Sequence, residues 1–118
     1  MKETISITKP NLTIKEKENI LYTIGQKYRE TRLRLNLAES EQPYSLSGIG
    51  FRYDRQYLHR IDESLRVCTI RTQLIIRNEF LEISEDHWYE TYFTSYAWVR
   101  ERRKAVLEFF AVLDLGTN

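Results

Sequence analysis

The chain contains few residues that would cross-link it or interrupt its backbone. Cys68 is its only cysteine, so an internal disulfide and a cysteine-rich zinc site are both excluded. With 4 glycines and 2 prolines among 118 residues, the composition indicates a folded domain rather than a disordered chain. No run approaches the ~18 apolar residues that a membrane span requires, and residues 1–10 lack the apolar stretch of a signal peptide. We therefore expect a cytoplasmic protein that does not enter a membrane.

The positive and negative charges of the chain nearly cancel. The formal net charge is +1, which gives no overall attraction to nucleic acid or to an anionic membrane. Apolar residues make up 42% of the chain and charged residues 30%, enough for one domain with its own core over residues 1–118. Beyond Glu82, however, all the positive charge is concentrated in one short basic run: Arg100, Arg102, Arg103 and Lys104.

The N-terminal third has the pattern of one long helix. Residues 1–11 are a polar arm, and the sequence 13–16 (TIKE) fits a capping box, in which a threonine and a glutamate satisfy the first free backbone amides of a helix. Apolar residues then recur every seven positions at Ile14, Leu21, Tyr28 and Leu35. We expect a helix over 13–38 that packs this stripe against a core and is long enough to support a homodimer.

The middle of the chain contains a loop and then further helix. Periodicity lapses over 40–53, where Pro43, Gly48 and Gly50 indicate a loop. A phosphate-binding loop is disfavoured there, because no Lys-Ser/Thr pair follows the glycines and no strand precedes them. From residue 54 to residue 81 helical spacing resumes, as one bent helix or as two, with a strand near 67–72 as the minor alternative.

The C-terminal third predicts two helices separated by a tight turn. Ser84 is a suitable N-cap for a short helix that carries Trp88, Tyr89 and Tyr92, and Thr94 or Ser95 is the next candidate cap. A strongly periodic helix should then occupy 96–113. This arrangement, over 84–113, is a helix-turn-helix, so we expect an all-α domain.

The last helix should be apolar on one side and basic on the other. One group faces a core: Trp98, Val99, Ala105, Val106, Phe109 and Leu113. The opposite group points away: Tyr96, Ala97, Arg100, Arg103 and Lys104. Arg102 falls within the apolar arc, where its stem can pack while its head reaches solvent. Arginine grips guanine with two hydrogen bonds, so Arg100 is the first candidate for a base contact and Tyr96 the second.

Nothing in the sequence predicts an enzyme, a metal site or a cofactor. His59 and His87 have no neighbouring histidine or cysteine, and Cys68 continues an apolar stripe as a packed thiol. Asp62 and Glu63 are sequence neighbours, which point about 100° apart on a helix and so do not form an acid/base pair.

Residues 93–110 (FTSYAWVRERRKAVLEFF) carry a family resemblance. This segment resembles the C-terminal signature of the ArpU/RinA-like phage transcriptional regulators, whose helix-turn-helix is similar to region four of bacterial sigma factors. The lead Phe93-Thr94, the arginine Arg100, the basic run 102–104, and the later Ala105 and Phe109 match the pattern. The chain differs at 96–97, where the family has Ser-Thr, at 98–99, where it has two tyrosines, and at Glu101, where it has an apolar residue.

The resemblance implies sequence-specific binding to double-stranded DNA, control of phage or mobile-element genes, and contact with RNA polymerase. The expected DNA-binding residues are Thr94, Ser95, Tyr96, Arg100, Arg102, Arg103 and Lys104. The alternative is a helical adaptor that binds another protein and uses the two C-terminal helices only for packing. A near-neutral charge and the altered Ser-Thr position favour that alternative.

Overall fold

The computed structural model describes residues 12–41 and 49–116. It contains α1 (Ile14–Glu41), α2 (Ile49–Arg66), α3 (Ile70–Ile76), a π-helical turn (Arg77–Leu81), a 3₁₀ turn (Trp88–Thr91) and α4 (Ser95–Gly116). No strand is present in these two stretches, so the predicted all-α class is confirmed. No helix in the same stretches is both long and apolar enough to cross a membrane. The expected polar arm, 1–11, lies outside the described residues.

The long first helix begins as predicted and continues further. The Thr13 amide donates to Glu16 Oε1 at 2.8 Å, and the Glu16 amide donates to Thr13 Oγ1 at 3.1 Å, which confirms the capping box. The predicted stripe is also confirmed, since Leu21, Tyr28 and Leu35 are buried. The helix ends at Glu41 rather than at residue 38.

The predicted loop over 40–53 is too long. α2 starts at Ile49, and only residues 42–48 of that range lie outside the described chain. The central segment forms two helices, and no strand forms near 67–72 because α2 ends at Arg66 and α3 begins at Ile70. Thr69 caps α3 by accepting a hydrogen bond from the Thr72 amide at 3.2 Å.

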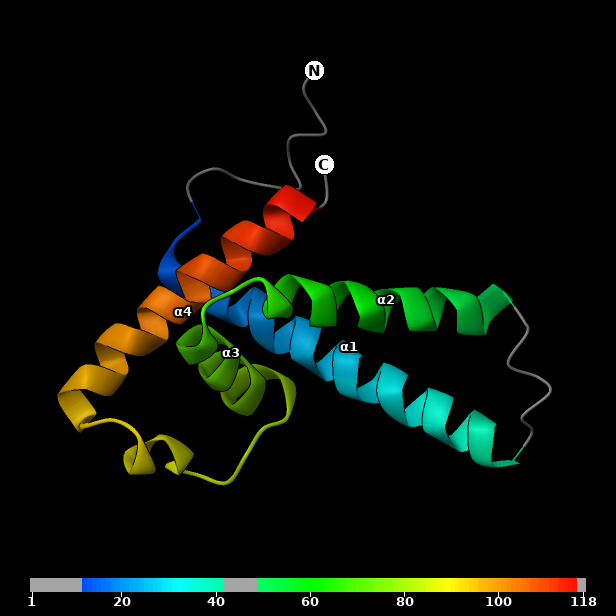
Figure 1. Cartoon of the computed structure of the whole chain (residues 1–118), viewed down its shortest axis with the longest axis horizontal. Coiled ribbons are helices and arrows are strands. Elements are labelled where there is room, and N and C mark those ends of the chain that lie inside the picture. Colours follow the sequence, from blue (N-terminus) through cyan, green and yellow to red (C-terminus); the bar gives the residue numbers. More distant parts are fainter. Residues whose placement is uncertain (1–11, 42–48, 117–118) are drawn as a thin grey trace, which may run out of the picture.

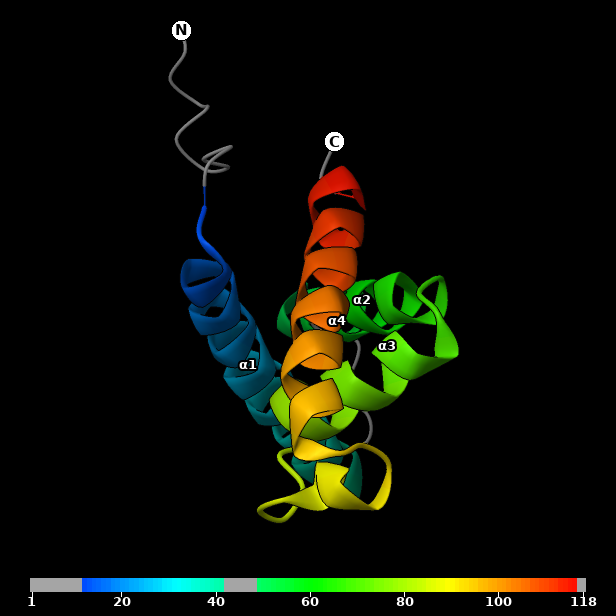
Figure 2. The same cartoon turned by 90° about the vertical axis from the view of Figure 1, so that its left-hand side faces the viewer.

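α4 lies between α1 and α3 and completes the core. Figure 1 shows α1 and α2 extending together to one side, while α4 crosses them at the other end. Figure 2 shows α4 with α1 on one flank and α3 on the other, and α4 packs against both helices. The core contains apolar side chains from all four helices and the π-helical turn: Leu21, Tyr28, Ile61, Leu65, Cys68, Ile75, Ile76, Phe80, Leu81, Trp98, Ala105, Val106, Phe109 and Leu113.

The backbones of α1 and the π-helical turn approach each other closely at Gly25. A Cβ atom on Gly25 would lie 1.8 Å from the Phe80 carbonyl oxygen, a distance that no packed structure allows. On the same side, Arg29 Nη1 donates to the carbonyl oxygens of Phe80 at 3.0 Å and Leu81 at 3.1 Å. Arg29 thereby satisfies backbone acceptors at the end of this helical segment.

We expect Gly25→Ala to lower the free energy of unfolding by about 3 kcal/mol, because the helices must separate to admit the methyl group. Helix propensity alone predicts the opposite sign, a gain of about 1 kcal/mol for alanine over glycine inside a helix. Urea unfolding of the variant and of Gln26→Ala, at the exposed neighbouring position, measures the difference. A Gly25→Ala protein as stable as the wild type would show that the crossing is not this close.

Candidate functional site

The start of α4 is fixed by the residue predicted to cap it. Thr94 Oγ1 accepts a hydrogen bond from the Ala97 amide at 3.1 Å, and the Thr94 carbonyl accepts from the Trp98 amide at 2.8 Å. These bonds satisfy two amides of the first turn. Thr94, Ser95 and Tyr96 are all exposed, so the first turn of α4 is accessible to a partner.

The segment that precedes α4 differs from the prediction. Residues 84–91 were expected to include a short helix capped by Ser84, but Ser84 Oγ instead donates to Asn78 Oδ1 at 2.6 Å. The only helical piece is the 3₁₀ turn, preceded by His87 at φ 61°. The turn is held by aromatic packing, because the Tyr89 ring stacks on Trp98 with centroids 4.3 Å apart. The helix that pairs with α4 is therefore α3 with its π-helical turn, and residues 82–94 connect the two.

Most of the predicted inner face of α4 is buried. Trp98, Ala105, Val106, Phe109 and Leu113 all belong to the core, as expected. Val99 does not, because its side chain is 66% exposed. At 100° per residue Val99 lies at the edge of the apolar arc, where it borders a hollow beside Ile14 and Glu18 of α1 instead of entering the core. The prediction that placed Val99 in the core is wrong.

The outer face of α4 carries three of the four predicted basic residues. Arg100, Arg103 and Lys104 are exposed, and Tyr96 is 82% exposed. Within residues 95–113 the acidic side chains are Glu101 and Glu108, and both are engaged by neighbours. Glu108 accepts hydrogen bonds from the Thr69 amide at 2.9 Å and from Thr72 Oγ1 at 2.6 Å. The three exposed cations of this face therefore outnumber the two carboxylates of the same stretch.

The carboxylate of Glu101 contacts basic side chains from two helices, α3 and α4. Its side chain is only 8% exposed, and its carboxylate lies 3.1 Å from Arg71 Nη1, 3.3 Å from Arg100 Nε and 3.6 Å from Lys104 Nζ. The hydrogen bond from Arg71 is the main reason that the pKa of the Glu101 carboxyl is lowered. One negative charge thus faces three positive charges, and the cluster remains cationic.

Arg102 faces the opposite way and is not part of this surface. Its guanidinium pairs with Glu18 of α1, donates to Tyr22 Oη at 2.8 Å and lies 3.5 Å from Glu79 Oε2. It also lies 5.2 Å from the centroid of the Phe80 ring. With 19% of the side chain exposed, Arg102 joins α1, α4 and the π-helical turn. The expectation that its head reaches solvent is wrong, because acidic and aromatic groups enclose most of the side chain.

Two further cations flank the outer face and were missed in the sequence. Lys17 of α1 lies with Nζ 5.5 Å from the centroid of the Phe110 ring, and Arg71 of α3 is joined to α4 through Glu101. Both are far from the basic run in sequence, so no local pattern signals them. One of these cations comes from α1 and the other from α3, the two helices that Figure 2 shows on either side of α4.

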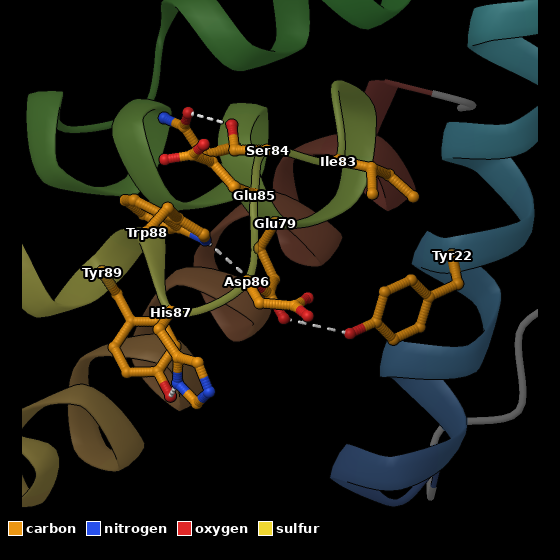
Figure 3. A pocket seen from close by; sticks show the side chains of 10 residues that line it. Tyr22, Glu79, Ile83, Ser84, Glu85, Asp86, His87, Trp88 and Tyr89 are labelled. Carbon is orange, nitrogen blue, oxygen red and sulfur yellow. Dashed lines mark hydrogen bonds between the residues drawn. The ribbon is translucent and has the colours of Figure 1, made fainter.

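The segment before α4 has the opposite charge. A cavity of about 310 Å³ lies here, and carboxylates and aromatic rings line much of it (Figure 3). Glu79 in its wall accepts hydrogen bonds from Trp88 Nε1 at 2.9 Å and from Tyr22 Oη at 3.2 Å. Residues 82–94 contain four acids and no lysine or arginine, so a phosphate group is repelled from this end of α4.

No group of three metal-ligating side chains occurs in 12–41 or 49–116. Cys68 is buried, and burial raises the pKa of its thiol to about 11, as expected for a packed thiol.

Comparison with protein-family models, curated proteins and solved structures gave no match.

We expect Arg102→Ala to lower the free energy of unfolding by about 2 kcal/mol or more, because the change leaves Glu18 and Glu79 partly buried without their cation. Arg103→Ala is the matched control, since this neighbour is exposed and its loss should change stability by no more than about 0.5 kcal/mol. Thermal and urea unfolding measure both. Equal effects of the two changes would contradict the assignment of Arg102 to the core.

Glu101 should make stability depend on pH. Its carboxyl pKa is lower in the folded protein than the ordinary value of 4.5, so its stabilisation is present above 4.5 and is lost as pH falls through the folded value. We expect Glu101→Gln to be less stable than the wild type at pH 7, with a difference that shrinks as pH falls below 4.5. Urea unfolding between pH 7 and pH 3 tests this, with Glu85→Gln at an exposed position as control. A constant difference across that range would exclude the proposed ion pairs as its source.

Proposed function

We propose that the chain binds double-stranded DNA through the outer face of α4. The observation that carries the proposal is the exposure of Arg100, Arg103 and Lys104 on one helix face, where they outnumber the two acids of the same stretch. Cations on an exposed helix pair with phosphates and release condensed counterions, which favours association with a duplex. A helix of this kind also fits the major groove, which is about 12 Å wide.

In this proposal the DNA contacts lie away from the tip of α4. The basic residues lie in the second and third turns, whereas the acidic segment 82–94 lies before the first turn. A duplex should therefore lie against the side of α4, with phosphates of the two strands near Lys17 on one flank and Arg71 on the other. Thr94 and Ser95 are at the margin of this contact, and Arg102 is outside it.

The regulatory part of the proposal depends on the resemblance of residues 93–110 to the ArpU/RinA-like regulators. It comprises control of phage or mobile-element genes and contact with RNA polymerase. Pairing of two copies through α1 would allow two half-sites to be read. Leu33 and Leu37 support such pairing, because they are one helical turn apart and exposed, on the side of α1 opposite the core.

A second candidate function is an adaptor that binds another protein through the same surface. The observation that favours it is the exposure of Tyr96 and Val99, which line one hollow, since exposed apolar groups that lie close together mark protein contacts. The two candidates differ in charge dependence, because an apolar contact is far less sensitive to salt.

We expect the protein to bind duplex DNA from the region upstream of its own gene, with an association constant that falls steeply with salt. The logarithmic salt slope should decrease by about 2–3 in a triple variant with alanine at Arg100, Arg103 and Lys104, at about 0.9 per phosphate contact. Fluorescence anisotropy at several salt concentrations measures the slope. Arg102 stays unchanged because it joins three elements of the fold, and circular dichroism of the triple variant checks that the loss of two partners of Glu101 leaves the helices intact.

A second triple variant, with alanine at Lys27, Arg52 and Arg60, removes the same charge from α1 and α2 and should bind nearly as the wild type does. Equal weakening by both triple variants would indicate that net charge alone attracts DNA. If the wild type has no salt-dependent affinity for DNA, the adaptor function replaces the proposal.

A further inference from the structure

The outer face of α4 contains a shallow hollow with an apolar floor among its cations. The hollow has a volume of about 420 Å³ and is lined by Tyr96, Val99, Arg100 and Arg103. Tyr96 and Arg100 are four residues apart, as are Val99 and Arg103, so two adjacent columns of side chains form its walls. Val99 is a branched apolar residue with 66% of its side chain exposed, and it lies outside the core, between this hollow and a second one that Ile14 and Glu18 of α1 also line.

Arg100 is held in an orientation suited to a base edge. Its Nε points to the buried Glu101 carboxylate at 3.3 Å, and its guanidinium carbon lies 5.7 Å from the centroid of the Tyr96 ring. These two contacts use Nε and one face of the guanidinium, so the two terminal amino groups can donate in parallel. Two parallel donors match the O6 and N7 acceptors that guanine presents in the major groove.

The remaining residues limit which bases this face can read. Adenine is usually read by asparagine or glutamine and cytosine by a carboxylate, and residues 95–113 contain neither amide side chain and no free carboxylate. Thymine is the one base that presents a methyl group in the major groove, and apolar side chains contact that methyl. The hollow beside Arg100 offers two such contacts, the Val99 methyl groups and the edge of the Tyr96 ring.

We propose that Val99, together with Tyr96, reads the methyl group of a thymine that neighbours the guanine bound by Arg100. This inference rests on the proposed DNA binding and deepens it, because it names the base step that the surface recognises. In this proposal the exposed side chain of Val99, which the sequence predicts to be buried, contributes to base specificity.

The test begins with selection of preferred duplexes from a random pool, followed by replacement of each thymine by deoxyuridine, which removes only the methyl group. In the wild type, we expect one replacement beside a guanine to weaken binding about threefold to tenfold, the effect of removing one buried methyl group. In Val99→Ala the same replacement should change affinity by less than about twofold, because the two changes act on one contact. Leu107→Ala, at an exposed apolar position further along α4, should keep the full deoxyuridine effect.

The outcomes separate this inference from the proposed function. Salt-dependent binding to a selected site in which no thymine methyl matters, or an equal deoxyuridine effect in the wild type and Val99→Ala, overturns the thymine assignment and leaves DNA binding in place. Failure of the wild type to bind any duplex overturns both. Circular dichroism of each variant confirms that the helices are intact.

Discussion

The close crossing of α1 and the π-helical turn at Gly25 determines where α4 can lie. Because Gly25 has no side chain, the Phe80 backbone reaches α1 and the Phe80 ring is fully buried beside Tyr22, with ring centroids 4.6 Å apart. Arg102 then packs over the same Phe80 ring and pairs with acids on both sides of the crossing. The close approach of the two backbones at Gly25 thus positions the Phe80 ring, and the contact of Arg102 with that ring fixes how α4 is rotated about its axis.

The rotation of α4 divides a continuous basic run into residues of two kinds. Arg102 is turned inward and joins three elements, while Arg103 and Lys104 are turned outward, although all three are adjacent in sequence. Glu101 acts on the outer side of α4. Its buried carboxylate binds both Arg71 and Arg100 and keeps these cations of α3 and α4 on the same surface. The charge of the outer face therefore depends on interior contacts as much as on composition.

Local signals in the sequence were sufficient for part of this structure. The capping box at Thr13, the heptad stripe of α1 and the cap at Thr94 follow from neighbouring residues, and all three are confirmed. Contacts between distant segments decided the rest. Stacking of Tyr89 on Trp98 outweighs the helix signal at Ser84, and Val99 borders a hollow beside α1 instead of entering the core. No periodicity within residues 95–113 reveals Arg71, because its link to α4 exists only in the folded chain.

The acidic segment 82–94 affects where along α4 a long polyanion can lie. Its carboxylates create a step from positive to negative potential along the helix axis, and this step distinguishes the two ends of α4. A rod-shaped ligand laid across the helix gains attraction on one side of the step and meets repulsion on the other. Placements of the same ligand near the two ends of α4 therefore differ in energy before any specific contact forms.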